Sequence, residues 1–291
     1  MKKKILLTGS QGFIGRNLYS FLKEKYDVFC VDHYAFPDNG ISRYFKVDLL
    51  SQESVDNFSR VVSDIKFYSV IHTAFLLCRP DDRQSLDYLH KNTQITENMV
   101  KLLKKINFGS LLNFSSIAVY PVKNAIFKEE SEINMSKNTE CLYGIAKFNS
   151  EMLFTFLLSD KAKIVNLRLC QVYGPGMQDD RLVGSFMKKL ADQNKITVYG
   201  NGKRVSNFLH VKDLCVAVSA VLANPSSGTY NLGCFKNMSY LDLAQKIIDE
   251  KGFPGSRIVK ISKGSTAKAK IATKKFVKTF GYKCTTIDFG F

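Results

Sequence analysis

The 291-residue sequence predicts an α/β protein with a doubly wound parallel sheet and a smaller mixed α/β lobe. Short apolar runs alternate with helical patterns over the first 168 residues, and a glycine-rich turn follows the first of these runs. The alternation breaks at Val172-Tyr-Gly-Pro-Gly176. Strands separated by helices run parallel, because each helix returns the chain to the same edge of the sheet. We therefore expect residues 1–169 to form the main domain and 170–291 mostly the smaller lobe, with some segments returning to the main sheet.

The first half predicts six strands, each of them a short run rich in apolar and β-branched residues. The helices between them show apolar residues on one side, and Ser51 with Glu53 gives the second helix an N-terminal capping signal. The strands are expected at 4–8, 27–32, 44–48, 69–73, 110–115 and 163–168, and a long helix at 85–105.

The second half has a less regular pattern. We expect a helix over about 180–193, a strand at 196–199, a Gly-Asn-Gly turn, a helix at 211–222 and a final helix capped by Ser239. The Lys-rich stretch 260–278 is expected to be a mobile or solvated edge.

Composition limits the classes of protein to which the chain can belong. No stretch approaches the roughly 20 apolar residues of a membrane span, and the basic start is broken at once by Thr8 and Gly9, so we expect no export. Seven cysteines without a Cys-x-x-Cys pair favour reduced thiols in a cytoplasm. The formal net charge of +16 suggests an anionic partner, which could be nucleic acid, a lipid surface or a phosphorylated small molecule, unless the lysines only solvate the surface.

A dinucleotide site is predicted where the first strand turns into the first helix, at Thr8-Gly-Ser-Gln-Gly-Phe-Ile-Gly15. Gly9, Gly12 and Gly15 allow the backbone to approach a pyrophosphate, and the helix N-terminus offers its N–H groups to the anion. Asp32 ends the next strand, where a carboxylate can bind both ribose hydroxyls and repel a 2′-phosphate. NAD is therefore expected rather than NADP, with Arg16 as the one feature that softens this preference. The alternative is a purely structural strand, turn and helix.

Tyr143 and Lys147 lie four residues apart, which places them on one face of a helix. An ammonium beside a phenol favours the ionised phenol, and this makes a tyrosine usable as an acid and base near neutral pH. Alone, such a pair most often consists of two exposed surface residues without a catalytic role. The glycine-rich turn in the same chain favours a catalytic pair.

These motifs together resemble the extended short-chain dehydrogenase/reductase family, whose members have a Rossmann-type sheet. The resemblance runs through the glycine turn, Asp48-Leu, His72-Thr-Ala-Phe, Ser115-Ser-x-x-Val-Tyr and Tyr143-x-x-x-Lys147, and it continues to Asp213. Nucleotide-sugar epimerases, dehydratases and 4-keto reductases are the best-known members. The resemblance implies a nucleotide-diphosphate sugar as substrate and a homodimer paired through the helix that carries Tyr143 and the long helix before the fifth strand.

The resemblance also implies the residue roles. Tyr143 would exchange a proton with a sugar hydroxyl, Lys147 would lower the pKa of that tyrosine, and Ser116 would steady charge on the reacting oxygen. The alternative for Ser116 is a strand-end hydroxyl that satisfies the backbone. The cofactor contacts would be Gly9, Gly12, Phe13, Ile14, Gly15, Asp32, Asp48, Leu49, Thr73, Ala74, Ser115, Tyr143, Lys147, Cys170 and Val172, and the substrate contacts Phe75, Ser116, Gln171, Lys203 and Arg204, without a metal.

The reaction is narrowed by departures from the family pattern. Dehydratases of this family carry an Asp-Glu pair directly after the position of Ser116, whereas this chain has Ile117 and Ala118, so a dehydratase is disfavoured. A 4-epimerase and a 4-keto reductase or dehydrogenase both remain open. Cys141, Cys170, His72 and His210 could in principle exchange protons, but a structural role is favoured for each.

Two further departures concern the substrate. Gln171 replaces the usual asparagine, and Ser206 stands where relatives have an arginine, so Arg204 or Lys203 would have to clamp the diphosphate. Two other classes of function stay open, namely a non-catalytic dinucleotide-binding regulator and a basic RNA-binding protein on the same fold. The intact Ser-Tyr-Lys set favours catalysis, and nucleic acid is not the expected partner.

Overall fold

The structure is a computed structural model that describes residues 1–35, 41–77, 85–137 and 141–284, with the backbone only at 137 and 141. Contacts within the chain define two units, and each is described by itself. The first unit comprises 1–121, 133–168 and 218–230, and the second comprises 122–132, 169–217 and 231–291.

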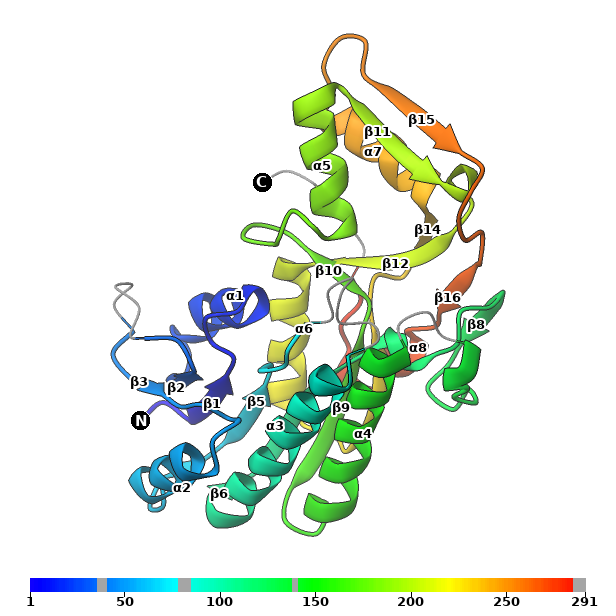
Figure 1. The fold of residues 1–291 in the computed structure, drawn as a ribbon. Helices are drawn as coiled ribbons and strands as arrows, with labels where there is room; N and C mark the ends of the chain where they lie inside the picture. The colour runs from blue at the N-terminus through cyan, green and yellow to red at the C-terminus, as the bar shows by residue number, and fades with distance from the viewer. Residues whose placement is uncertain (36–40, 78–84, 138–140, 285–291) are drawn as a thin grey trace. The chain divides into compact units, whose positions relative to one another are not determined.

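A seven-stranded parallel sheet forms the centre of the first unit (Figure 1). The five inner strands β1, β2, β5, β7 and β9 are buried almost throughout, which explains why they appear in the sequence as mostly apolar runs and not as alternating patterns. The spatial order is β3-β2-β1-β5-β7-β9-β13, so the direction of winding reverses between β1 and β5. Ligands of open α/β sheets bind at such a reversal, beyond the carboxyl ends of the strands. The strands are β1 (Lys4–Thr8), β2 (Asp27–Asp32), β3 (Tyr44–Lys46), β5 (Ser69–His72), β7 (Ser110–Ser116), β9 (Lys163–Leu169) and β13 (Gly228–Leu232).

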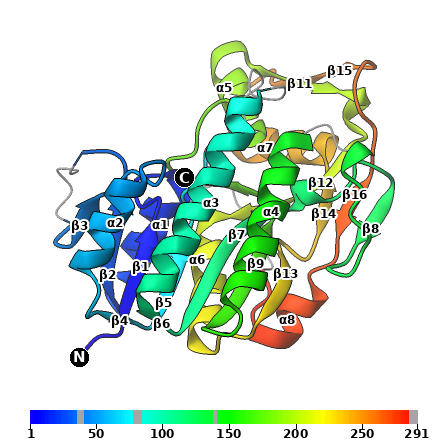
Figure 2. The ribbon, with the colours of Figure 1, turned by 60° about the horizontal axis from the view of Figure 1, so that its bottom comes forward.

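Helices cover both faces of this sheet, as right-handed crossover connections require when the winding reverses. Figure 2 shows α2, α3 and α4 side by side in front of the strands. Ser51 and Ser85 cap α2 and α3 through their side-chain oxygens, which confirms the predicted starts of these helices. The helices are α1 (Phe13–Leu22), α2 (Gln52–Val61), α3 (Leu86–Lys105) and α4 (Cys141–Leu158), and the shorter elements are β4 (Lys66–Phe67), β6 (Asn107–Phe108), η2 (Ile117–Val119) and η3 (Met135–Lys137).

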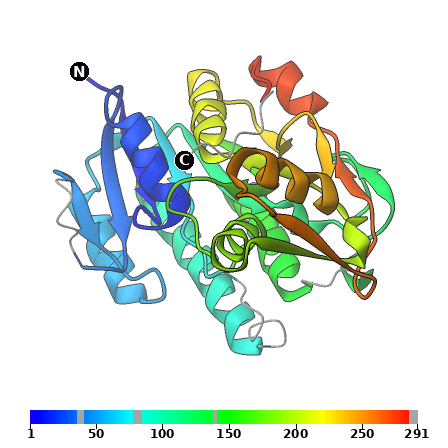
Figure 3. The ribbon, with the colours of Figure 1, turned by 90° about the horizontal axis from the view of Figure 1, so that it is seen from above.

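The second unit consists of small sheets with helices packed on them. Its apolar core lies between α5, α7 and the strand β11, where Phe186, Ile196 and Leu243 are buried. Figures 1 and 3 show α5 and α7 next to each other against the pair of strands β11 and β15. The strands are β8 (Ala125–Phe127), β10 (Gln171–Tyr173), β11 (Lys195–Tyr199), β12 (Val205–His210), β14 (Asn237–Ser239), β15 (Arg257–Ile261) and β16 (Ala269–Ile271), and the other elements are α5 (Leu182–Gln193), η4 (Gly200–Gly202), α7 (Tyr240–Lys251) and α8 (Lys274–Phe280). The helix α6 (Val211–Ala223) begins in the second unit and continues into the first from residue 218.

The Lys-rich stretch 260–278 differs from its prediction. It ends β15 and supplies β16 and α8, so the helix capped by Ser239 is not the last one. Ile271 and Phe276 are buried and anchor the segment, while the lysines between them stay exposed. The prediction of a solvated edge is correct for the side chains and wrong for the backbone. Within the described part of the chain, no helix combines the length and the apolar character needed to cross a membrane.

Candidate active site

The glycine turn of the first unit leaves no room for side chains at two of its three glycines. Gly9 has φ +72°, and a Cβ there would lie 2.6 Å from the backbone nitrogen of Ala74. A Cβ on Gly15 would lie 2.0 Å from the carbonyl oxygen of Gly9. Gly12 is exposed and is the N-cap of α1 without a side-chain cap, so the N–H groups of the first turn remain available to an anion.

Asp32 is bound to this turn from the end of β2. Its carboxylate accepts hydrogen bonds from the backbone N–H groups of Gln11 and His33, both at 2.8 Å, and the side chain is only 5% exposed. The acid predicted for the ribose therefore lies beside the turn predicted for the pyrophosphate. Its contact with a ribose stays a prediction.

Two further predicted cofactor positions follow strands of the same sheet. The Thr73 hydroxyl donates to the carbonyl oxygen of Thr8 at 2.8 Å, which places Thr73 and Ala74 against the glycine turn. After β3, exposed Asp48 accepts from the N–H of Leu50 at 2.9 Å, and the carbonyl of buried Leu49 accepts from Asn98 at 2.8 Å. Asp48 and Thr73 thus follow strands on opposite sides of the reversal: β5 lies directly beside β1, and β3 is separated from β1 by β2.

Tyr143 and Lys147 lie on α4, and the ring of Phe75, which follows β5, contacts both. Phe75 and Tyr143 meet edge to face with 6.0 Å between ring centroids, and the Lys147 Nζ lies 3.6 Å from the Phe75 centroid. The ammonium is farther from Tyr143, at 6.0 Å from its ring centroid, because it donates to the carbonyl oxygen of Phe114 at 2.6 Å. Burial lowers the pKa of Lys147 to about 7, against an opposing effect of Glu151. The amine can therefore change its charge near neutral pH.

Ser116 ends β7 directly beside α4. Its hydroxyl accepts a hydrogen bond from the N–H of Ala118 at 3.1 Å, as the structural alternative for this residue requires. A hydroxyl also carries an O–H donor, so this bond does not prevent Ser116 from donating to a substrate oxygen. A Cβ on Gly144 would lie 2.4 Å from the carbonyl oxygen of Ala118. The missing side chain at Gly144 therefore lets the helix that carries Tyr143 approach the backbone next to Ser116.

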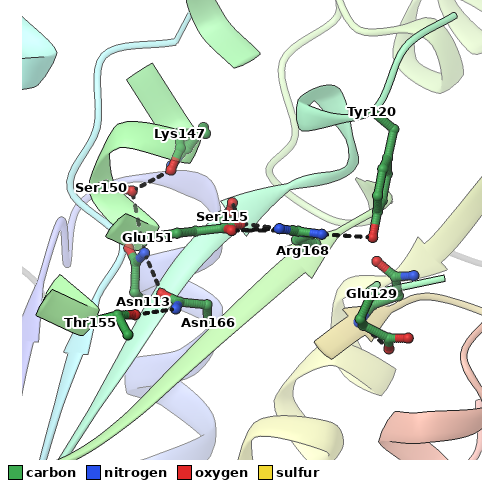
Figure 4. Close-up of polar contacts among 11 residues, drawn as sticks. Asn113, Ser115, Tyr120, Glu129, Lys147, Ser150, Glu151, Thr155, Asn166 and Arg168 are labelled. Atoms are coloured by element: carbon green, nitrogen blue, oxygen red, sulfur yellow. Dashed lines mark hydrogen bonds and ion pairs between the residues drawn. The ribbon is translucent and has the colours of Figure 1, made fainter. Parts of the chain in front are cut away.

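Behind these residues, buried polar side chains join α4 to β7 and β9 (Figure 4). Ser115 donates to the carboxylate of Glu151, which also forms an ion pair with Arg168. The Ser115 hydroxyl thus donates its hydrogen bond inside the protein, and a cofactor contact of this residue stays a prediction.

Two of the predicted residues of the second unit, Gln171 and Arg204, both contact Tyr240. The Gln171 amide donates to the hydroxyls of Ser206 at 3.0 Å and Tyr240 at 3.3 Å, and the Arg204 guanidinium lies 5.5 Å from the centre of the Tyr240 ring. Lys203 is exposed at a pocket of about 310 Å³ that Lys268 and Lys270 also line. Arg204 and Gln171 therefore share Tyr240 as a neighbour, whereas Lys203 lines a pocket with other lysines.

The other residues singled out from the sequence include Cys170, Val172 and His210 of the second unit, whose burial or hydrogen bonds are typical of structural residues, and Cys141 of the first unit. Burial raises the pKa of the Cys170 thiol far above its usual range, and Val172 pairs with Leu209 in the sheet. His210 accepts from the N–H of Lys212 at 3.1 Å. The side chain of Cys141 lies outside the described residues. Contacts of Cys170, Val172, Gln171 and Lys203 with cofactor or substrate stay predictions.

Comparison with known proteins identifies the family. Residues 5–233 match the family model described as "NAD dependent epimerase/dehydratase family". The chain belongs to this family. It is an extended short-chain dehydrogenase/reductase, as the sequence motifs predicted.

Curated relatives of this epimerase/dehydratase chain carry out different reactions. It is 26% identical over 274 residues to the dTDP-D-glucose 4,6-dehydratase of Dictyostelium discoideum, with 85% of this chain and 62% of that protein covered. It is 25% identical over 264 residues to the UDP-glucuronate 4-epimerase of Thermodesulfobacterium geofontis, with 84% and 81% covered. Among solved structures, MoeE5 in complex with UDP-glucose and NAD has the same fold, with a TM-score of 0.81 at 23% identity over 98% of this chain and 94% of that one.

Sequence reasoning assigned no role to the buried partners of the candidate site. Glu151 follows Lys147 by one helical turn, as Lys147 follows Tyr143, and this spacing could have predicted a carboxylate on the same helix face. Arg168 was visible as a charge at the end of the predicted strand 163–168. Tyr240, directly after the Ser239 cap, gave no signal of its own.

Proposed function

We propose that this protein is an NAD(H)-dependent oxidoreductase acting at a carbon, C4, of a nucleotide-diphosphate sugar, as a 4-epimerase or a 4-keto reductase or dehydrogenase. The observation that carries the proposal is the grouping of Ser116, Tyr143 and Lys147 at the junction of β7 and α4 in the unit that holds the glycine turn. Membership of the NAD dependent epimerase/dehydratase family supports it.

The glycine turn fits the cofactor. Gly9 and Gly15 permit backbone contacts that no other residue allows, Gly12 is exposed at an uncapped helix start, and Asp32 is fixed beside it. NAD bound there would supply the hydride acceptor, and NADH the donor. The binding of MoeE5 to NAD, with the same fold, is in line with this choice.

The chain's own residues would then handle the proton. Tyr143 takes the proton of the sugar hydroxyl when that carbon is oxidised, and returns one when it is reduced. Ser116 donates its O–H to the same oxygen and stabilises charge that develops on it. Lys147, buried and held by the Phe114 carbonyl, provides a nearby positive charge that favours the ionised phenol.

A dehydratase is disfavoured although one relative bears that name. The two residues after Ser116 are Ile117 and Ala118, which begin the turn η2 and carry no acid or base. Removing water needs such a group in addition to the tyrosine. We therefore restrict the proposal to redox chemistry at a single carbon, with or without inversion.

Two side chains of the second unit support the proposed substrate class. Arg204 supplies a guanidinium suited to a diphosphate, and it lies over the ring of Tyr240, which Gln171 also contacts. The assignment to this substrate is supported by the relatives named above as acting on sugar nucleotides. We expect the enzyme to work in the cytoplasm, in a pathway of carbohydrate biosynthesis.

The proposal includes a homodimer formed through α3 and α4. The apolar side chains Phe156 and Leu157 of α4 are 73% and 45% exposed, an unusual placement for large hydrophobic residues on one helix. A second copy would cover them. Light scattering at micromolar concentration should give twice the chain mass, and a monomeric mass would contradict this part of the proposal.

The test of the reaction is kinetic. Purified protein is incubated with NAD or NADH and a set of UDP- and dTDP-sugars while absorbance from NADH is followed. A stoichiometric change indicates a reductase or dehydrogenase, and isomerisation without change indicates an epimerase. Tyr143→Phe should lower turnover by at least about a hundredfold, the lower range for general acid-base catalysis.

The matched control is Tyr26→Phe. Tyr26 packs on Tyr68 just before the start of β2, at the amino ends of the parallel strands, whereas the candidate site lies at their carboxyl ends. It should retain wild-type turnover. Near-wild-type activity of Tyr143→Phe, or no turnover of any sugar nucleotide by the wild type, would overturn the proposed function.

A further inference from the structure

An ion pair lies in the interior of the first unit, directly behind Ser116. Arg168 on β9 and Glu151 on α4 are 4% and 3% exposed, and two guanidinium nitrogens face the carboxylate at 2.9 and 2.7 Å. Burying two charges costs desolvation free energy, and apolar residues of similar volume often stabilise a fold as well or better. Packing alone does not account for a pair of this kind, so its other hydrogen bonds indicate what it does.

Each partner of the pair holds one side of Ser116. The carboxylate of Glu151 accepts from the hydroxyl of Ser115, the preceding residue. The guanidinium of Arg168 donates to the hydroxyl of Tyr120 at 2.9 Å, just after the turn η2. The backbone before and after Ser116 is thereby attached to the same buried pair, as Figure 4 shows.

The pair also fixes this segment to the helix of Tyr143. Glu151 lies one turn beyond Lys147 on α4, and Lys147 donates to the carbonyl oxygen of Phe114 at 2.6 Å. Two successive residues of β7, Phe114 and Ser115, are therefore bonded to two successive turns of α4. Such bonds define how far Ser116 stands from Tyr143 along the helix.

We propose that Arg168 and Glu151 form a positioning pair that holds Ser116 in place relative to Tyr143 and Lys147. Neither residue is assigned a contact with substrate or cofactor. The inference rests on the proposed function for its effect on turnover, but its effect on the geometry of Ser116 does not depend on the substrate.

Glu151 also acts on the charge of Lys147. This electrostatic effect can be measured separately from the positioning of Ser116. The charged and titratable groups that face this amine are Glu151 and Tyr143 on α4 and His72 on β5, and Glu151 is itself paired with Arg168 on β9. Glu151 raises the pKa of Lys147 against the larger effect of burial. Replacing Glu151 by a neutral residue removes this support, so Lys147 should lose its proton at a lower pH.

The test uses two variants and a control in the full-length protein. Glu151→Gln keeps the shape of the side chain and removes its charge. The double variant Glu151→Met with Arg168→Met removes both charges and fills the same space, which keeps the fold accessible if the single variant does not fold. The control is Thr155→Val, which loses only the bond between Thr155 and Asn166 farther along the same helix.

Both test variants should lower kcat by about a hundredfold, the cost expected when a reacting group is misplaced by about 1 Å, while KM changes little. In the Glu151→Gln variant, the alkaline loss of kcat should also move to lower pH. Crystal structures of the wild type and the double variant should show the Ser116 hydroxyl displaced relative to Tyr143 by about 1 Å or more. Thr155→Val should match the wild type in all three measurements.

The outcomes separate the two proposals. A folded double variant with wild-type kcat, or with Ser116 unmoved, overturns the positioning role. If Glu151→Gln lowers kcat without shifting the pH profile, the link to Lys147 is wrong. If the wild type turns over no sugar nucleotide while Ser116 is displaced in the double variant, the proposed function fails and the positioning pair stands.

Discussion

The candidate site residues of the two units are held in different ways. In the first unit, glycines bring backbone against backbone, and Lys147 and Ser115 are buried with their polar atoms bonded. In the second unit, Gln171 and Arg204 are half-buried and contact the side chain of Tyr240. The first arrangement tolerates little change in volume, whereas the second can be altered one side chain at a time.

This difference matches what each unit has to recognise. A cofactor and a hydride transfer impose one geometry, which a close-packed backbone and buried bonds can fix in advance. Substrate choice depends on a few polar groups that contact the sugar nucleotide. If the comparison is right, changes in the first unit should abolish folding, cofactor binding or kcat, and changes in the second should act mainly on KM.

The largest effect is expected at the glycine turn. Gly15→Ala places a Cβ 2.0 Å from the Gly9 carbonyl oxygen, so the turn must open. The free energy of unfolding should fall by at least about 1–3 kcal/mol, as for other overpacked sites, and NAD affinity should fall with it. Thermal unfolding and calorimetric titration with NAD measure the two effects.

Gly12→Ala is the matched comparison, because a Cβ there lies 3.3 Å from the same oxygen and Gly12 is exposed. It should fold like the wild type. Equal melting temperatures and NAD affinities for Gly15→Ala and the wild type would show that the turn has more room than the structure indicates.

A smaller effect is expected where α4 approaches η2. Gly144→Ala sets a Cβ 2.4 Å from the Ala118 carbonyl oxygen, which should push Tyr143 away from Ser116 and lower kcat by about tenfold to a hundredfold. Gly184→Ala in the second unit is an equally crowded substitution in a helix, with its Cβ 2.7 Å from the carbonyl oxygen of Gln178.

Both substitutions should lower the melting temperature, but only Gly144→Ala should change kcat in the protein that remains folded. An equal loss of kcat in the two variants would mean that general destabilisation, and not the distance between Tyr143 and Ser116, controls turnover.

The buried amine of Lys147 gives a pH-dependent effect on stability. Its pKa of about 7 in the folded protein lies below its ordinary value of 10.5, mainly because of burial. Between these values the unfolded chain binds more protons than the folded one, so this group makes stability rise with pH from about 7 to about 10.5. Below pH 7 both states are charged and the full cost of burying the charge is present.

Lys147→Met removes this contribution. The free energy of unfolding of the Lys147→Met variant relative to the wild type should therefore be greatest below pH 7 and decline between pH 7 and 9, as measured by urea unfolding at each pH. Lys161→Met, at an exposed lysine beyond the end of α4, should show no such trend. A constant difference between Lys147→Met and the wild type would mean that Lys147 keeps its proton over this range.

The sequence was sufficient to predict six of the seven strands of the first unit's sheet, because these strands are mostly apolar runs that end at turns. β13 was not predicted, since Gly-Thr-Tyr-Asn-Leu has few apolar residues and its place in the sheet depends on tertiary contacts. In the second unit, β12 and β15 were missed for a similar reason. Polar and charged residues interrupt both strands, and short-range patterns cannot show which segment pairs with them.

For the candidate site, the sequence predicted the residue types but not the contacts between distant segments. Residue spacing identified Tyr143, Lys147 and Ser116, because the chemistry needs those residue types at fixed positions. It did not show that the Lys147 ammonium binds the carbonyl of Phe114, nor that Glu151 and Arg168 hold the segment around Ser116. Those contacts join segments far apart in the chain, and no local pattern records them.

The smallest effect is expected in the second unit, at the basic pair Lys203 and Arg204. Arg204 lies over Tyr240, whose hydroxyl accepts from Gln171, whereas Lys203 is exposed at a different pocket. If Arg204 binds the diphosphate, Arg204→Ala should raise KM for the sugar nucleotide by about tenfold, the loss of roughly 1.4 kcal/mol of binding, with kcat within about twofold. Lys203→Ala should change KM by less, since an exposed lysine acts only as a screened point charge. The comparison between the units would be wrong if Arg204→Ala lowered kcat strongly at unchanged KM, because the residue would then act on the chemical step and not on substrate binding.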